Sequence, residues 1–346
     1  MKYVHICPAD KFIPGFIELM YQHFEFSEHQ FWIYGDTHKY GIPAADNIFL
    51  ISGSIADRLR LLVALMRCRK VIFHSFHGIR LALLLLLNPW SIRKSYWFIW
   101  GGDLYQSSAN QRKIKWHITE CLRKYVIRRM AGIVTYIRGD YLNACHWYRC
   151  EGKWYECLMY TSNVFTPQEK NIATCVKSET LTILVGNSAL PTNNHLSALS
   201  ILQKYADKNI SIVCPLSYGI QEYGRQIQIT GQRMFGKKFT AITRFMPVED
   251  YLTLLRQIDI AVFNHTRQQA MGNTIALLGE GKTVFLNPGT TQWDFFCEKQ
   301  IHVCDLQSFS LTLLPEQTVQ ANQEIIRRYF SRDNLINQLS LLFQAR

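Results

Sequence analysis

The sequence lacks the signals that several large classes of protein require. It contains no G-x-G-x-x-G, which argues against a dinucleotide-dependent enzyme, and no G-x-x-x-x-G-K-[ST], which excludes a P-loop nucleotidase. None of its ten cysteines forms a C-x-x-C pair, so we expect reduced, mostly buried thiols and no zinc finger. The longest apolar run, Leu81 to Leu87, has seven residues. A membrane-spanning helix needs roughly 20, and no secretory signal is present, so a cytoplasmic location is expected.

Acidic residues are scarce in one long segment. Between Arg58 and Arg129 there are fifteen lysines or arginines and only two acids, Asp103 and Glu120, which gives +13 in a chain whose total is +12. Such a field favours an anionic partner, namely nucleic acid, phospholipid or a phosphorylated substrate, although a merely solvated surface is the plain alternative. No RNA- or DNA-binding module is recognisable, so we expect no nucleic acid as partner.

What the sequence does contain is a regular alternation of buried strands and helices. This alternation predicts parallel sheets covered by helices on both faces. A polar segment without periodicity, residues 166–180, divides the alternation into two series. We therefore expect an α/β protein with two Rossmann-like, doubly wound domains, residues 1–165 and 181–320, that face a cleft. The helices of residues 321–346 would follow, with room to pack back on the first domain.

Three helices of the first half differ in their expected faces. The helix from Asp57 to Arg69 is predicted to bury Leu59, Leu62, Val63 and Met66, and the helix from Ile79 to Leu87 is apolar all round and should be buried. The helix from Gln111 to Met130 is basic. It is expected to present cations beside an apolar stripe and two interfacial aromatics, Trp116 and Tyr125, to anionic lipid; the cations are Arg112, Lys113, Lys115, Arg123, Lys124, Arg128 and Arg129. The alternative is that the stripe packs on the sheet.

Candidate donor-binding residues follow strands of the second half. Gly186-Asn187-Ser188 forms a strand-to-helix turn whose amides could approach an anion, although an ordinary tight turn looks the same. Arg267-Gln268-Gln269 brings a guanidinium and two amides to a strand end, just before a helix that Gly272-Asn273 opens, and Tyr218 lies in a neighbouring loop. A fixed cation beside a helix N-terminus suits a diphosphate. No D-x-D is present, so we expect catalysis without a metal or other cofactor.

Candidate catalytic residues follow strands of the first half. Asp103 comes after Gly101-Gly102 and is a candidate to take the acceptor hydroxyl proton or to bind a sugar hydroxyl; a helix N-cap is the competing interpretation. His74 and His77 flank another turn, where a structural role is equally compatible with the sequence. Arg138, in Arg138-Gly139-Asp140, is a third candidate, and an ion pair or N-cap is its alternative.

Several of these segments, in this order, resemble one known family. They are Phe73-His74 with His77-Gly78, Trp100-Gly101-Gly102-Asp103-Leu104-Tyr105, Arg138-Gly139-Asp140, Ile183-Leu184-Val185-Gly186-Asn187-Ser188, Tyr251-Leu252 with Leu254-Leu255-Arg256-Gln257 and Asp259, and Arg267-Gln268-Gln269 with Gly272. They look like glycosyltransferase family 56, the TDP-N-acetylfucosamine:lipid II N-acetylfucosaminyltransferases of enterobacterial common antigen synthesis. The resemblance covers roughly residues 70 to 305 and is weak over the first 65 residues.

The resemblance implies a GT-B fold, a TDP-4-acetamido-4,6-dideoxygalactose donor, and an undecaprenyl-diphosphate-linked acceptor at the cytoplasmic face of the inner membrane. The first domain should take the acceptor through catalytic Asp103, His77 and Arg138, with acceptor or membrane contacts from His74, Tyr105, Arg112, Lys113 and Lys115. The second domain should bind the nucleotide. The family reaction suggests retention. An O-antigen pathway, another donor or acceptor, a nucleic-acid-binding protein and a dinucleotide-dependent oxidoreductase are the alternatives.

Overall fold

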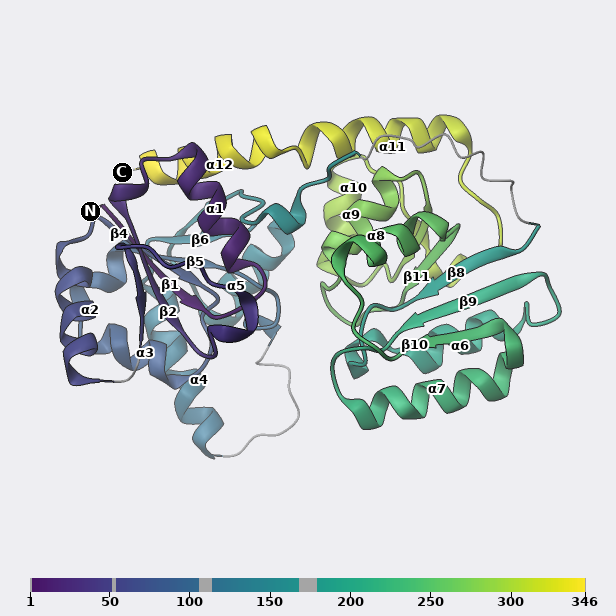
Figure 1. Ribbon diagram of the computed structural model, residues 1–346, viewed down its shortest axis with the longest axis horizontal. Coiled ribbons are helices and arrows are strands. Elements are labelled where there is room, and N and C mark those ends of the chain that lie inside the picture. Colours follow the sequence, from purple (N-terminus) through teal and green to yellow (C-terminus); the bar gives the residue numbers. More distant parts are fainter. Residues whose placement is uncertain (1, 52–53, 106–113, 168–178, 346) are drawn as a thin grey trace. The chain divides into compact units, whose positions relative to one another are not determined.

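The computed structural model describes residues 2–51, 54–105, 114–167 and 179–345. The chain forms two compact units, which are described separately. The first contains Met1–Ser162 together with Leu335–Arg346, and the second contains Asn163–Asn334 (Figure 1). Most of the predicted linker, residues 168–178, lies outside the described residues. Among the described helices, none is both long enough and apolar enough to cross a membrane.

The first unit is built on a parallel sheet of seven strands in the order β3-β2-β1-β4-β5-β6-β7. The strands are β1 (Tyr3–Pro8), β2 (His29–Tyr34), β3 (Ile48–Leu50), β4 (Lys70–His74), β5 (Ser95–Phe98), β6 (Gly132–Val134) and β7 (Lys153–Tyr155). The chain runs outward from β1 to β3 and then returns to β4, which pairs with β1. The loops after β1 and β4 therefore diverge at the position where open parallel sheets bind ligands.

Helices cover both faces of this sheet. One face packs on α2 (Ile55–Arg67), α3 (Ile79–Leu86), α4 (Ile114–Arg128) and α5 (Arg138–Tyr148), with Val4 and Ile6 of β1 in that core. The other face, which carries Tyr3 and His5, packs on α1 (Ile13–His23) and α12 (Arg332–Gln344) through Phe16 and Phe343. Alternation along each strand assigns its side chains to the two layers.

The structure corrects the faces predicted for two of these helices. On α2 the buried residues are Leu61, Ala64 and Leu65, whereas Leu59 is 58% exposed and Met66 is 49% exposed. This helix carries two apolar stripes, and periodicity alone does not say which one meets the sheet. On α3 the predicted burial all round is also wrong, because only one side of the helix packs on the core and Leu83 and Leu87 are exposed on the other.

The basic helix also differs from the prediction. Its described part is α4, and residues 111–113, including Arg112 and Lys113, lie outside the described residues. Arg123 was expected on the surface but is fully buried, while Ile114, Ile118 and Tyr125 are exposed.

The cysteines depart from expectation too. All nine described are free, but only four are buried.

The second unit repeats the architecture with a parallel sheet of six strands in the order β10-β9-β8-β11-β12-β13. The strands are β8 (Leu181–Val185), β9 (Ile210–Pro215), β10 (Phe239–Ile242), β11 (Ile260–Phe263), β12 (Thr283–Leu286) and β13 (Cys304–Asp305). The helices are α6 (His195–Gln203), α7 (Gln221–Phe235), α8 (Val248–Gln257), α9 (Met271–Gly279), α10 (Thr291–Glu298) and α11 (Glu316–Tyr329). Strand order reverses between β8 and β11, so the loops after these strands frame a second ligand-binding edge.

The two last helices serve different units. Helix α11 packs on α9 in the second unit, where Gln323 Nε2 donates to the carbonyl of Gly279 at 2.9 Å. From Leu335 onward α12 belongs to the first unit. There the Tyr3 hydroxyl donates to the Phe343 carbonyl at 3.0 Å, and the buried Lys70 ammonium donates to the Leu342 carbonyl in the last turn of the helix.

Candidate functional site

The turn after β8 has a tightly specified backbone. Gly186 has φ of 66°, and a Cβ there would lie 2.5 Å from His195 Nε2 and 2.9 Å from Asn193 Oδ1. Only glycine fits this conformation beside those side chains. The side chain of Asn187 donates to the Tyr218 hydroxyl at 3.0 Å, and its oxygen accepts from Gln269 Nε2 at 2.8 Å. The turn is therefore joined to the loops after β9 and β11.

The predicted use of this turn's backbone amides needs correction. The Gly186 N–H donates to the Val262 carbonyl at 3.1 Å, and the Asn187 N–H donates to Asn193 Oδ1 at 2.9 Å. Because a bonded amide is no longer a free donor, these two groups do not supply an anion site. Ser188 is buried and its Oγ accepts from Asn193 Nδ2 at 3.1 Å. Asn187 is buried with both ends of its amide bonded, so the exposed side chain beside this turn is that of Tyr218.

The start of α9 has the features of an anion site. Its first intrahelical bond runs from the Thr274 N–H to the Ala270 carbonyl. The N–H groups of residues 271–273 therefore have no acceptor within the helix and point out of its N-terminal end. Ala270 has φ of 58°, a left-handed conformation that is uncommon for a residue with a Cβ and typical of functional loops. Arg267 lies in the same loop, half-buried. Arg267 and the N-terminus of α9 thus belong to one loop, and their joint binding of a diphosphate stays a prediction.

Arg267 also lies near Tyr218. Burial raises the pKa of the Tyr218 hydroxyl, whereas a hydrogen bond with Ser188 and the charge of Arg267 act in the opposite direction. The phenol ring is half-exposed. Tyr218 and Arg267 therefore form one polar surface beside α9, suited to phosphate oxygens.

The remaining predicted donor residues differ in what they contact. Gln269 is buried, and its oxygen accepts from Thr192 at 2.7 Å, so this side chain joins loops. Asn273 donates to the Tyr251 hydroxyl at 2.8 Å. Gln268 is half-buried, and its carbonyl accepts from Arg267 at 2.9 Å. Of these three described residues, Gln268 alone has a side-chain amide that makes no hydrogen bond to another described residue.

Two histidines lie beneath the donor edge. Burial lowers the pKa of His195 to about 4 and that of His265 to about 3. His265 Nε2 lies 3.2 Å from Asn193 Oδ1, which already accepts the Asn187 N–H. Both rings are therefore neutral near pH 7, and His265 supports Asn193 from below.

In the first unit, Asp103 is buried and fully engaged. One carboxylate oxygen accepts from the Phe76 N–H at 2.8 Å and from Trp97 Nε1 at 2.6 Å, and the other accepts from the Trp100 N–H at 2.9 Å. Three donors leave little lone-pair capacity for an acceptor proton. The geometry gives Asp103 a structural role that joins the loops after β4 and β5. Its predicted role as a base stays a prediction.

Arg123 completes this ionic arrangement from α4. It donates to the Phe76 carbonyl at 3.1 Å and to the Asp103 carbonyl at 2.8 Å, and it pairs with Glu120. Its guanidinium also lies over the Tyr148 ring. We call Asp103, Arg123 and Glu120 the ionic clasp. The clasp holds the backbone of Phe76 in the turn after β4, and His77 is the next residue.

His77 and Arg138 are the predicted catalytic side chains that remain exposed. Burial and the charge of Arg123 lower the pKa of His77, while Asp103 and Glu120 act in the opposite direction. Arg138 opens α5 after β6. Arg138 and Asp140 do not form an ion pair in the part of the chain that the structure describes. Asp140 is buried and accepts from the Tyr105 hydroxyl at 2.9 Å. Tyr105, a predicted acceptor contact, is thereby tied to α5.

The prediction that His74 contacts the acceptor or the membrane is wrong. His74 is fully buried under α1, and burial lowers its pKa to about 3. Its Nε2 lies 3.0 Å from His5 Nδ1, and its Nδ1 lies 2.7 Å from the Tyr160 hydroxyl. His5 Nε2 in turn lies 2.9 Å from His29 Nδ1. The four side chains form one buried hydrogen-bonded chain across the sheet.

The sequence did not single out the aromatic cluster at the end of this chain. Trp100 Nε1 donates to the Tyr160 hydroxyl at 2.7 Å, and Phe12 packs edge-on against Trp100 and stacks on Tyr160. Phe12 and Trp100 are half-buried, so their rings reach the surface beside the loops after β1 and β5. Partly exposed aromatic faces at a sheet edge suit the apolar side of a sugar. The two tryptophans of the Trp-Phe-Ile-Trp-Gly-Gly stretch were the available signal.

Residues 37–332 of the chain match the family described as 4-alpha-L-fucosyltransferase, glycosyl transferase group 56. The chain belongs to this glycosyltransferase family. It is therefore a nucleotide-sugar-dependent transferase, as the sequence predicted.

Solved structures agree on the fold of this transferase. The N-terminal domain of a trehalose-6-phosphate phosphatase from Candida albicans is 9% identical, with 99% of this chain and 96% of that one covered at a TM-score of 0.67. A sucrose-phosphate synthase from Thermosynechococcus elongatus is 10% identical, with coverages of 99% and 98% and a TM-score of 0.65. WaaG, a glycosyltransferase of lipopolysaccharide biosynthesis, is 11% identical, with coverages of 99% and 100% and a TM-score of 0.58. The predicted GT-B fold of two Rossmann-like parallel-sheet domains is confirmed.

Two features of the transferase bear on cofactors and surfaces. Within the ranges that the structure describes, no group of three or more His, Cys, Asp or Glu side chains could hold a metal ion. Metal independence itself stays a prediction. Lys115, predicted to contact acceptor or membrane, is exposed on α4.

Proposed function

We propose that this transferase moves 4-acetamido-4,6-dideoxy-D-galactose from TDP to an undecaprenyl-diphosphate-linked saccharide, without a metal, as a peripheral protein at the cytoplasmic face of the bacterial inner membrane. The saccharide would belong to enterobacterial common antigen or O-antigen synthesis. The observation that carries the proposal is the convergence of Arg267, Tyr218 and the start of α9 at the carboxyl edge of the second sheet, in a chain of this family.

The donor half of the proposal follows from charge. A nucleoside diphosphate leaves with growing negative charge on its oxygens. The Arg267 guanidinium and the N–H groups that open α9 are fixed in place before the reaction, so they stabilise that charge without reorganising. In the first unit His77 and Arg138 are exposed polar side chains that the acceptor could contact.

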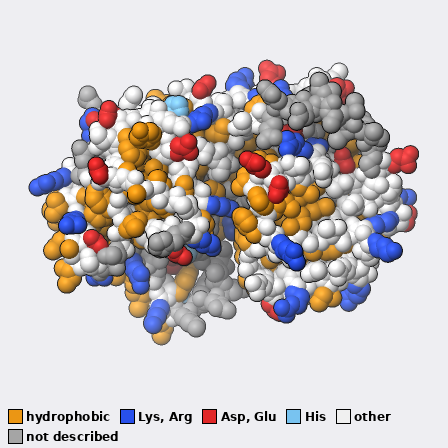
Figure 2. Space-filling view, in the orientation of Figure 1, with side chains coloured by type: hydrophobic (Ala, Val, Ile, Leu, Met, Phe, Trp, Pro, Cys, Tyr) orange, Lys and Arg blue, Asp and Glu red, His pale blue; other side chains and the backbone are white. Residues whose placement is uncertain are grey.

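The membrane half rests on a surface of the first unit. Helix α3 packs against α4, and the short helix Pro89–Lys94 packs against both α2 and α3. Exposed apolar residues lie along these elements; they are Leu59, Met66, Leu83, Leu87, Trp90, Ile114, Ile118 and Tyr125. Hydrophobic side chains also gather broadly over the first unit in Figure 2, with Lys and Arg among them.

Charge and apolar exposure together favour a lipid surface. Each cation held near anionic lipid contributes about 1 kcal/mol, so a few exposed cations such as Lys115, Lys124 and Arg128 suffice for reversible binding. The exposed aromatics Trp90 and Tyr125 suit the headgroup boundary.

A binding and transfer assay tests the function. Thermal shift with TDP, UDP, GDP, NAD and RNA oligonucleotides should give the largest stabilisation with TDP. Transfer from the TDP-sugar to lipid-linked saccharides should then follow. Stabilisation by NAD or RNA alone, or transfer only from another nucleotide, would contradict the proposed donor.

Liposome sedimentation tests the membrane surface. Binding should require anionic lipid, weaken at high salt and fall in the double variant Lys115→Glu, Lys124→Glu. The matched control is Arg233→Glu with Lys237→Glu, which makes the same charge change at exposed positions of the second unit. Equal binding to neutral and anionic vesicles, or equal losses in both double variants, would refute electrostatic docking through this surface.

A further inference from the structure

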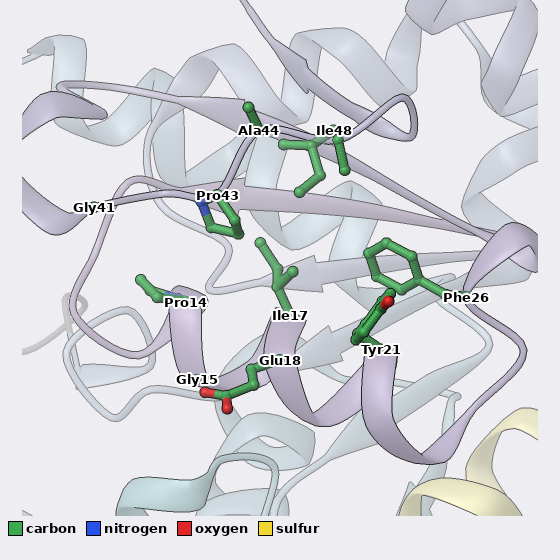
Figure 3. A pocket seen from close by; sticks show the side chains of 11 residues that line it. Pro14, Gly15, Ile17, Glu18, Tyr21, Phe26, Gly41, Pro43, Ala44 and Ile48 are labelled. Atoms are coloured by element: carbon green, nitrogen blue, oxygen red, sulfur yellow. The ribbon is translucent and has the colours of Figure 1, made fainter.

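An open apolar groove of about 470 Å³ lies beside α1 in the first unit. Figure 3 shows one wall formed by α1 and the other by the chain segment that leads from β2 to β3. The α1 side contributes Pro14, Gly15, Ile17, Glu18 and Tyr21, and the facing side contributes Phe26, Gly41, Pro43, Ala44, Ala45 and Ile48. The sequence did not predict this groove, and no residue assigned above to donor or acceptor lines it.

The lining determines what the groove can bind. Of its eleven residues only Glu18 carries a charge, and Tyr21 adds a hydroxyl on a side chain that is 70% exposed. Glu18 accepts from Gln22 at 3.0 Å on the outer side of α1. A sugar or a nucleotide needs convergent hydrogen-bonding groups, which this lining does not offer. A flexible hydrocarbon chain without polar atoms needs none.

The walls are held by contacts outside the groove. Asn47 Nδ2 donates to the carbonyls of Phe26 and His29, at 3.0 and 2.8 Å, which ties the β3 end of the loop to the start of β2. The Phe26 ring stacks on buried Phe31, and Ile17 is buried against the sheet. The groove is therefore formed before any ligand arrives, which reduces the entropy cost of binding.

One end of the groove leads to the acceptor side of the candidate site. Pro14 and Gly15 lie at the start of α1, directly after the carboxyl end of β1. Phe12, one residue before the helix, packs against Trp100 and Tyr160. A ligand chain leaving the groove at this end thus meets the aromatic cluster beside the loop after β5.

Charged groups lie at this same end. The Lys11 ammonium lies 5.1 Å from the centroid of the Phe12 ring. Burial raises the pKa of Asp10, while the Phe12 N–H and the charges of Lys11 and Lys39 act in the opposite direction. The two lysines can contact phosphate oxygens. Asp10 and Asp36 keep the end from being strongly basic. The apolar groove must therefore supply most of the preference for its ligand.

From this arrangement we infer that the groove binds the isoprenoid chain of the acceptor, with the carrier's diphosphate beside Lys11 and Lys39 and its sugars against Trp100. This inference rests on the proposed function for the identity of the acceptor. The groove takes the isoprene units nearest the diphosphate.

Photolabelling tests the groove without any transfer step. The probe is a polyprenyl phosphate with a diazirine on its second isoprene unit, presented in mixed micelles to the full chain. Labelled peptides should come from residues 14–26 and 41–48, and excess unlabelled polyprenyl phosphate should suppress the labelling. Labelling confined to α2, α3 or α4, or labelling that excess polyprenyl phosphate does not suppress, would overturn the assignment.

A groove-filling variant gives a kinetic test. Ala45→Trp introduces a large side chain at an exposed lining position, and Ala45→Ser is the matched control that keeps the size. Losing the contacts of a few methylene groups should raise KM for the polyprenyl-linked acceptor by roughly tenfold or more. KM for a short-alkyl acceptor with the same sugars and diphosphate should not change. Equal effects on both acceptors would contradict the inference.

The two tests separate the possible failures. A wild-type chain that transfers to no lipid-linked acceptor would refute the proposed function, while labelling would still decide whether the groove binds polyprenyl chains. Transfer to the polyprenyl acceptor that Ala45→Trp and Ala44→Trp both leave unchanged would refute the groove and leave the proposed function standing.

Discussion

In the first unit the turns after β4 and β5 are held by buried ions, with Asp103 and Arg123 bonded to the backbone of both turns. In the second unit the turn after β8 is held by neutral amides, with Asn193 and Gln269 in the equivalent supporting place. The architecture is the same, but the ionic clasp uses its cation internally. The second unit keeps Arg267 near the surface, where a diphosphate can reach it. The contrast indicates why an arginine in a basic segment need not be a ligand-binding residue.

Removing the clasp's cation should produce the largest effect. Arg123→Met leaves Glu120 without its buried partner, and breaking such a pair costs about 3–5 kcal/mol of unfolding free energy. Urea denaturation measures this. The control is Arg128→Met, whose partner Glu151 is exposed, so its loss should stay below about 1 kcal/mol. Similar losses in both variants would show that the clasp is no stronger than a surface pair.

Asp103→Asn should come next, because it keeps the shape but replaces one accepting oxygen with a donor that faces N–H groups. We expect transfer to fall by roughly 100-fold with donor affinity intact. A structural role also predicts a loss of about 1–3 kcal/mol in unfolding free energy, which a purely catalytic base would not show. Near-normal turnover in this variant would refute the role as a base, and an unchanged unfolding free energy would refute the structural role.

The second unit offers the opposite test, in which function changes and stability does not. Arg267→Ala should weaken TDP binding by about 1.5–3 kcal/mol, the contribution of a charge-assisted hydrogen bond, with little change in unfolding. Isothermal titration of TDP provides the measurement, and Arg225→Ala on exposed α7 provides the control. A TDP dissociation constant that matches the control would remove Arg267 from the donor site.

Acid should affect both units through their buried histidines. Burial holds the pKa of His74 and that of His265 to about 3, below the value near 6.5 of an unfolded chain. The unfolded state therefore binds more protons below pH 6.5, so this stability is complete above pH 6.5 and is lost as pH falls toward 3.

Each such histidine should contribute a slope of about 1.4 kcal/mol per pH unit in that window. His265→Gln should flatten the dependence of urea unfolding on pH between 6 and 5, whereas His302→Gln at an exposed position should not. Parallel curves for wild type and His265→Gln would contradict this.

The smallest expected effect is that of removing divalent metal. If Arg267 and the start of α9 stabilise the leaving diphosphate, transfer in excess EDTA should continue at a rate close to that with magnesium. Complete loss of transfer, restored by magnesium or manganese, would show that the cation of the second unit is not sufficient.

Much of the fold could be predicted because strand and helix periods alternate along the whole chain. The face of α2 could not, since Leu61 and Leu65 compete with Leu59 and Met66, and only the sheet decides between the stripes. Burial of Arg123 was equally hidden. Arg123 lies in a basic segment with exposed Lys124 and Arg128, and its partners at residues 76 and 103 come from distant turns.

The candidate site was predictable where one segment carries the chemistry. Arg267 and the start of α9 are adjacent in sequence, so their convergence follows from a strand-to-helix turn. The chain of His5, His29 and His74 joins three separate strands and depends on register. The occupied amides of the turn after β8 depend on Asn193, six residues further along, whose side chain turns back on Asn187. The Pro-Thr-Asn-Asn-His stretch hinted at polar residues there, but not at their direction.

The position of α12 has a consequence for synthesis of the chain on the ribosome. Residues near its end contact the first strand, through Tyr3 and Phe343, and satisfy buried Lys70. The strands of the first sheet emerge early, but one face of the sheet, which α1 covers only in part, lacks the rest of its cover until α12 has been made. During that interval the edge carrying Tyr3 and His29 stays open, so the domain that begins first is completed last. A nascent chain whose residues up to Asn334 have left the ribosome would therefore hold a finished second unit and an unfinished first one.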